Sequence, residues 1–204
     1  MSTYCDLAPG HEWHGPYHDT EYGFPLTGDA ELFERLVLEI NQAGLSWLTV
    51  LKKRAAFRAA YGGFDPERVA GYGKRDVRRL LADAGIIRNR LKVEAAIANA
   101  QAILDLRASH GSFAGWLEAH ARIEGGKAQG KTRGRKNAKT ASGGRPRTRA
   151  EWVTLFKQTF RFTGGEIVGE FLLSTGYLPG AHQENCPVYP RIVKLRPPWL
   201  RLSS

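Results

Sequence analysis

The fold is decided by the stretch LEINQAGLSW, residues 38–47, in which one helix ends and a second begins. Upstream, apolar residues recur at helical spacing and predict a buried face: Leu32, Phe33, Leu36, Val37 and Ile40. Glu39 lies only about 20° outside this face. Because burying a lone carboxylate is costly, Glu39 either bends into water at the helix end or faces a pocket beside Trp47.

The rest of the chain also follows helical patterns. Ser46 is a suitable N-cap for the second helix, and Asp65 followed by Pro66 starts another. We find no alternating strand pattern and no internal repeat. The sequence therefore predicts an all-α fold, with helices over residues 29–43, 46–61, 66–71, 76–84, 87–108, 113–121, 152–160 and 166–174.

One segment, residues 122–149, carries most of the net charge. It contains ten Lys or Arg residues and a single acidic residue, and the whole chain has a formal charge of +10. The segment is rich in Gly and poor in apolar residues, so it cannot bury enough surface to offset its ordering entropy. We predict a flexible loop that interrupts one globular domain, formed by residues 1–121 and 150–204. This loop either attracts phosphate groups or acts as a solubilising linker.

Composition excludes several classes of protein. No apolar run approaches the roughly 20 residues of a membrane span, and residues 1–19 do not resemble a signal peptide. Two cysteines cannot form a disulfide framework, although one disulfide between Cys5 and Cys186 is an alternative. We expect a cytoplasmic monomer that does not bind membranes, with an extended Pro-rich tail over residues 187–204.

A Gly-containing turn, residues 83–88, separates two of the predicted helices. Such a turn can present backbone N–H groups and the N-terminus of the next helix to a phosphate, and Arg88 adds positive charge. An ordinary helical hairpin without a ligand has the same pattern.

The chain ends contain a candidate metal site. Cys5 and His18 lie near one end, and His182 and Cys186 lie near the other. Two thiolates and two imidazoles form the closed tetrahedral set that structural Zn²⁺ prefers. The spacing alone also fits two unrelated buried cysteines with histidines that serve other purposes, and His11 and His14 are competing ligands.

Several longer motifs follow one another in a characteristic order. They are YHDTEYGFP at 17–25, LE at 38–39, QAGLSWLTVLKKR at 42–54, FDP at 64–66, DAGIIR at 83–88 and FRFTGG at 160–165, followed by Gly176-Tyr177 and residues 182–186. Together they resemble the bacterial 3-methyladenine DNA glycosylases of type I, which belong to the helix-hairpin-helix group. The resemblance covers residues 5–121 and 155–186.

The resemblance implies a monofunctional base-excision repair enzyme. Such an enzyme flips 3-methyladenine out of alkylated double-stranded DNA and hydrolyses its N-glycosidic bond. Glu39 would then be the catalytic carboxylate that hydrogen-bonds the extruded base, and Trp47 would stack on it. Tyr17 and Tyr22 would line the pocket.

The resemblance also implies contacts outside the pocket. Leu45 would enter the gap left by the flipped nucleotide, and Gly85, Ile87 and Arg88 would hold the DNA backbone. A structural Zn²⁺ would join the two termini through the four ligands Cys5, His18, His182 and Cys186.

The chain departs from the family pattern at two aromatic positions. Tyr22 stands where the family usually has Trp, and Leu7 stands where a Trp is often found, with Trp13 nearby as a substitute. These changes support a second hypothesis, a zinc-stabilised helical nucleic-acid-binding protein with lost or altered excision. The joint presence of Glu39, Tyr17 and Trp47 favours the enzyme.

Overall fold

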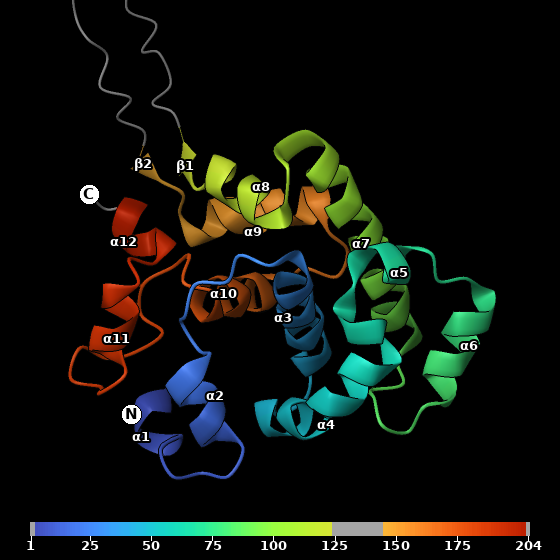
Figure 1. Cartoon of the computed structure of the whole chain (residues 1–204), viewed down its shortest axis with the longest axis horizontal. Coiled ribbons are helices and arrows are strands. Elements are labelled where there is room, and N and C mark those ends of the chain that lie inside the picture. The colour runs from blue at the N-terminus through green and yellow to red at the C-terminus, as the bar shows by residue number, and fades with distance from the viewer. Residues whose placement is uncertain (1–2, 124–144, 203–204) are drawn as a thin grey trace, which may run out of the picture.

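The computed structural model describes residues 3–123 and 145–202 (Figure 1). Its elements are helices α1 (Tyr4–Leu7), α2 (His14–Thr20), α3 (Asp29–Gln42), α4 (Trp47–Ala60), η1 (Gly62–Phe64), α5 (Pro66–Ala70), α6 (Lys74–Ala82), α7 (Arg90–His110), α8 (Phe113–His120), α9 (Arg149–Thr159), α10 (Gly165–Ser174), α11 (Tyr189–Lys194) and α12 (Pro198–Leu202), and strands β1 (Arg122–Ile123) and β2 (Arg145–Pro146). The predicted all-α class is confirmed, apart from this one pair of two-residue strands. None of these helices is long and apolar enough to span a membrane.

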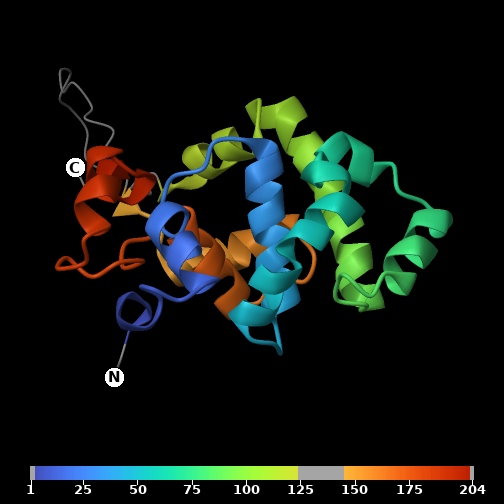
Figure 2. The same ribbon diagram turned by 60° about the horizontal axis from the view of Figure 1, so that its bottom comes forward.

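Helix α3 lies at the centre of the molecule in both views (Figures 1 and 2). It packs against α4, α7, α8 and α10, and every residue from Leu32 to Asn41 is buried. The apolar face predicted from the sequence is therefore in the core. Because neighbouring helices also cover the other sides of α3, the charged residues Glu34, Arg35 and Glu39 are buried with it.

An aromatic cluster joins the parts of the chain on either side of the basic segment. The ring of Phe113 in α8 lies 5.8 Å from that of Phe171 in α10 and 5.0 Å from that of Phe160. Trp116 lies 5.5 Å from Phe156 in α9. These rings belong to one continuous core, so residues before 123 and after 145 pack together.

The predicted helix starts at Ser46 and Asp65 are confirmed. The Ser46 hydroxyl accepts a hydrogen bond from the Thr49 amide at 3.3 Å, and the Asp65 carboxylate accepts one from the Glu67 amide at 2.9 Å. The long helix α7 begins later than predicted, because the Asn89 side chain caps it. Ile87 therefore lies in the turn between α6 and α7.

The structure of the C-terminal tail differs from the sequence prediction. Residues 187–204 are predicted to be extended, but the described part contains α11 and α12. Each helix has a proline in its first turn, Pro190 and Pro198, where the missing N–H is not needed for the helix. The short helices α1 and α2 are likewise absent from the sequence prediction.

Both edges of the basic segment form regular secondary structure, which the sequence did not predict. Helix α9 begins at Arg149, because Thr148 and Glu151 form a capping box. The strands β1 and β2 pair in antiparallel fashion. The remaining residues of the predicted flexible loop, 124–144, lie outside the described residues.

The aromatic cluster predicts a large loss of stability in Phe113→Ala. The substitution removes a fully buried ring that contacts Phe160, directly after α9, and Phe171 in α10, so we expect the free energy of unfolding to fall by about 3–5 kcal/mol. Urea unfolding followed by circular dichroism measures this change. As a control, Leu91→Ala removes an exposed side chain and should change stability by less than about 0.5 kcal/mol. Equal losses in both variants would contradict this account of the core.

Candidate active site and metal-binding cluster

An aromatic cavity of about 360 Å³ lies between the N-terminal helices, α3, α4 and α10. Four residues singled out from the sequence meet in its wall: Tyr17, Tyr22, Glu39 and Trp47. Sequence reasoning missed three further lining residues, Tyr4, Gln42 and Glu170. A signal for Glu170 is present in the sequence, because this acid interrupts the apolar run of residues 167–173.

The aromatic rings form one continuous wall. Tyr17 lies 5.2 Å from Trp47 and 5.7 Å from Tyr22, and Tyr22 lies 5.2 Å from Tyr4, measured between ring centroids. The indole Nε1 of Trp47 is buried and has no hydrogen-bond partner. A buried donor without a hydrogen-bond partner is uncommon in folded proteins.

Glu39 is the buried acid of the cavity, with a side chain only 4% exposed. Burial raises the pKa of its carboxyl to about 8; the positive charge of Arg35 opposes this rise and the negative charge of Glu170 adds to it. This raised pKa favours the protonated form of the carboxyl near neutral pH. A cation that enters the cavity favours the ionised carboxylate instead.

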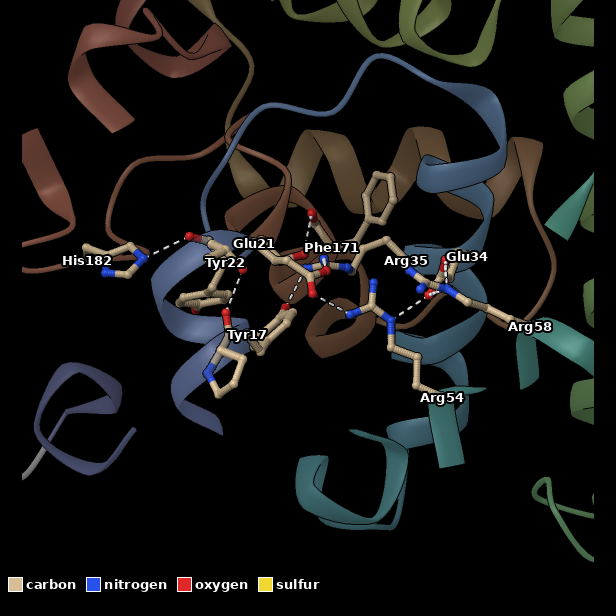
Figure 3. A network of polar contacts seen from close by, with 12 residues as sticks. Tyr17, Glu21, Tyr22, Glu34, Arg35, Arg54, Arg58, Phe171 and His182 are labelled. Atoms are coloured by element: carbon tan, nitrogen blue, oxygen red, sulfur yellow. Dashed lines mark hydrogen bonds and ion pairs between the residues drawn. The ribbon is translucent and has the colours of Figure 1, made fainter. Parts of the chain in front are cut away.

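A network of charged residues lies next to Tyr17 and Tyr22 (Figure 3). Arg35 is 2% exposed and donates hydrogen bonds to the Tyr17 hydroxyl and to Glu21. Arg54 joins Glu21, at 2.6 Å, to the buried Glu34, at 2.5 Å. The network provides partners for the buried Glu34 and Arg35 of α3, and the hydrogen bond from Arg35 fixes the position of the Tyr17 hydroxyl.

A second cavity, of about 330 Å³, continues from the first toward the loop between α3 and α4. The two cavities share Glu39, Gln42 and Glu170, and Leu45 lines the second one. Leu45 is 44% exposed and follows Gly44, whose φ of +83° is unfavourable for other residues. Among the described residues that line these two cavities there is no Lys, Arg or His.

The turn between α6 and α7 brings together the three residues predicted to contact DNA there. The Gly85 amide donates to the Asp83 carboxylate at 2.7 Å, and a Cβ at Gly85 would lie 2.9 Å from that of Ala56. This close approach of α4 explains the glycine. Ile87 is half-buried, and Arg88 is exposed.

The four predicted metal ligands Cys5, His18, His182 and Cys186 form one cluster. Their ligand atoms all lie within 4.8 Å of one another, close enough to hold a metal ion. The Sγ of Cys186 lies 3.3 Å from His182 Nδ1 and 3.7 Å from His18 Nε2. Both cysteines are free, so the alternative of a disulfide between them is wrong.

The other nitrogen of each clustered imidazole has a partner that orients the ring. His18 Nδ1 lies 2.7 Å from the Asp19 carboxylate, and His182 Nε2 lies 2.8 Å from the backbone oxygen of Tyr22. Such outer contacts are typical of metal-binding histidines. The competing candidate ligands, His14 and His11, make other contacts. His14 Nδ1 lies 3.0 Å from the Tyr4 hydroxyl, and His11 Nδ1 accepts a hydrogen bond from the Trp13 amide at 3.1 Å.

Comparison with known proteins identifies the family of this chain. The family model described as Methyladenine glycosylase matches residues 9–189. The chain belongs to the methyladenine glycosylase family. It is 38% identical over 174 residues to DNA-3-methyladenine glycosylase 1 of Escherichia coli (strain K12), which covers 85% of this chain and 90% of that protein.

Solved structures of 3-methyladenine DNA glycosylase I have the same fold. The Staphylococcus aureus protein, in a study of 3-methyladenine recognition, matches with a TM-score of 0.73 at 30% identity, over 91% of this chain and 95% of that one. A variant in complex with 3-methyladenine matches with a TM-score of 0.73 at 30% identity, over 92% and 97%. The resemblance predicted from the sequence motifs is confirmed.

The two aromatic departures from the methyladenine glycosylase pattern have different outcomes. Tyr22 lines the first cavity beside Tyr4, as expected for a pocket residue. Leu7 is 64% exposed, and Trp13 lines a separate cavity on the outer side of Tyr17. Trp13 therefore does not replace a missing indole in the wall of the first cavity.

The raised pKa of Glu39 predicts a pH-dependent effect of Glu39→Gln on stability. Since folding raises this pKa from 4.5 to about 8, the folded protein favours the protonated acid and loses stability as the pH rises through that interval. The variant lacks this loss. Its advantage in free energy of unfolding should therefore grow to a few kcal/mol above about pH 8 and vanish near about pH 4.

Thermal or urea unfolding across this pH range measures the difference. Glu31→Gln, which changes an exposed acid on the same helix, is the matched control and should differ little from the parent protein at any pH. A constant difference between Glu39→Gln and the parent protein would contradict the assignment of the raised pKa.

Proposed function

We propose that this chain is a monofunctional DNA glycosylase that flips 3-methyladenine out of alkylated double-stranded DNA and hydrolyses its N-glycosidic bond. The observation that carries the proposal is the buried carboxyl of Glu39 inside an aromatic cavity. Family membership and the related complex with 3-methyladenine give the same substrate class.

The cavity suits a cationic purine. Adenine methylated at N3 carries a positive charge while it is attached to DNA, so it is already a good leaving group. An electron-rich indole such as Trp47 gains about 1–2 kcal/mol from stacking on a cationic ring. The enzyme therefore has to extract the base and hold it while water reaches the sugar, and it does not have to protonate the base strongly.

Glu39 selects the cation through its own ionisation. Burial raises the pKa of its carboxyl and favours the protonated form, whereas a cationic base next to it stabilises the carboxylate. The carboxylate then accepts a charge-assisted hydrogen bond from the exocyclic amine of the base. Neutral adenine offers no such stabilisation, so recognition favours the methylated base.

We assign DNA binding to two loops, at residues 43–45 and 83–88. The turn at residues 83–88 corresponds to the hairpin of a helix-hairpin-helix motif, and we propose that Gly85, Ile87 and Arg88 hold the phosphate backbone. The exposed side chain of Leu45 enters the duplex where the base has left. The charge of the basic segment, residues 122–149, adds affinity for phosphates without sequence preference.

We propose that the metal of the Cys5, His18, His182 and Cys186 cluster is zinc. Two thiolates and two imidazoles fit the closed tetrahedral set of a structural zinc site, and each imidazole is already oriented by a second partner. Zinc bound there would stabilise the packing of the chain ends. The closed ligand set leaves no position for substrate.

The second hypothesis is a zinc-stabilised nucleic-acid-binding protein with lost or altered excision. The observation that favours it is Tyr22, where the family usually has an indole. The buried carboxyl between aromatic rings favours the enzyme, because a protein that only binds DNA does not need one.

Excision of the methylated base should depend on Glu39. Removing the charge in Glu39→Gln weakens a charge-assisted hydrogen bond, so we expect release of 3-methyladenine to slow by about 10- to 100-fold. Chromatography of the free bases released from methylated duplex DNA measures it. The control Glu31→Gln should match the parent protein. Release at the parental rate by Glu39→Gln would refute the pocket assignment, and no release by the folded parent protein would favour the second hypothesis.

Metal content should depend on Cys186. We expect about one zinc per chain in the parent protein, and loss of both zinc and thermal stability in Cys186→Ala. Elemental analysis and thermal unfolding measure the two effects. His11→Ala removes a histidine outside the cluster and should keep its zinc. A folded parent protein without zinc would contradict this proposal.

A further inference from the structure

Two lysines connect the loop at residues 43–45, which lines the second cavity, to the turn at residues 83–88. We propose that Lys53 and Lys92 are positioning residues that join the loop at residues 43–45 to the turn at residues 83–88, so that insertion of Leu45 and the grip on the DNA backbone are coupled. This inference rests on the proposed glycosylase function and adds a coupling device to it.

Lys92 holds the end of α3. Its side chain is 5% exposed, and its ammonium donates to the backbone oxygens of Asn41 at 3.0 Å and Ala43 at 2.7 Å. The last carbonyl groups of a helix have no partner within the helix and carry partial negative charge, so a cation there is favourable. Lys92 thus fixes the backbone directly before Gly44 and Leu45.

The same residue is anchored to the turn. Lys92 lies in the first turn of α7, and its amide donates to the Asn89 side chain that caps this helix. Asn89 directly follows residues 83–88. A shift of the turn therefore moves the start of α7, and with it the ammonium that holds the other loop.

Lys53 makes the reverse connection. It lies on α4, which begins directly after the loop of Leu45, and its ammonium donates to the backbone oxygens of Ala84 at 2.8 Å and Gly85 at 3.3 Å. Each lysine therefore lies on the helix that follows one loop and holds the backbone of the other loop. An ammonium has three donors, which suits a pair of carbonyl acceptors.

The reciprocal arrangement has a consequence for excision. If the two loops move as one unit, binding of the backbone by the turn sets the depth to which Leu45 enters the duplex. Without the lysines the protein still binds DNA, but Leu45 enters at a less favourable position. The base cavity itself does not contain either lysine, so its affinity for the free base is unaffected.

The experiment compares Lys53→Met, Lys92→Met and the double variant under single-turnover conditions. We expect each single variant to excise 3-methyladenine from duplex DNA about tenfold more slowly at saturating enzyme. The fall in excision rate of the double variant should be smaller than the product of the two single falls, because both lysines serve the same coupling. Binding of free 3-methyladenine should stay within about twofold of the parent protein, which a merely structural loss would not allow.

Lys52→Met is the matched control, because it removes the same charge from the exposed neighbour of Lys53. Lys52→Met should retain the parental excision rate. An equal loss of excision rate in Lys52→Met and Lys53→Met would mean that the lysines only attract phosphate, and it would overturn the proposal. An unchanged excision rate in Lys53→Met would also overturn it. If Lys92→Met does not fold, Lys53→Met and the rescuing variant Lys53→Arg decide the question. An inactive parent protein would instead refute the proposed function.

Discussion

The burial of α3 is the constraint on which the rest of the structure depends. A helix covered on several sides cannot send its polar side chains to water, so each one needs a partner inside the protein. Glu34 has Arg54 as a partner. Arg35 has Tyr17 and Glu21 as partners. Glu39 instead faces a cavity, and the low dielectric of its surroundings raises its pKa to about 8. The proposed recognition of a cationic base follows from this buried carboxyl in the cavity wall.

The cavity wall forms where the N-terminal and C-terminal parts of the chain meet beside α3. Tyr4, Tyr17 and Tyr22 come from the first residues of the chain, whereas Glu170 comes from α10. The metal-binding cluster joins the same ends, and His182 contacts the backbone of Tyr22 directly. The cluster therefore supports the aromatic wall although it lies outside it, and a metal bound there would hold the position of a pocket residue.

The loop at residues 43–45 and the turn at residues 83–88 are shaped by backbone contacts. Gly44 supplies a positive φ before Leu45, and Gly85 permits the close approach of Ala56. The carbonyl groups at both loops are held by lysines from helices that are distant in sequence. A search for charged pairs would miss these lysines, because their acceptors are backbone oxygens whose position depends only on the fold.

Much of the fold and four residues of the cavity wall could be predicted from the sequence. Apolar spacing identified α3, and the caps at Ser46 and Asp65 are local interactions between neighbours in the chain. The motif around Tyr17, Glu39 and Trp47 identified the family, and with it the four metal ligands. Both kinds of signal lie within short stretches, which is why the sequence alone contains them.

The tertiary structure decided everything that requires distant residues to meet. It brought Tyr4 and Glu170 into the cavity wall, and it separated Trp13 from that wall. It also determined whether Glu39 reaches water, since helical spacing leaves both outcomes possible and the packing of the N-terminal residues, α4 and α10 around Glu39 decides between them. The pKa of a carboxyl depends on the dielectric and the charges around it, and these are properties of the folded chain.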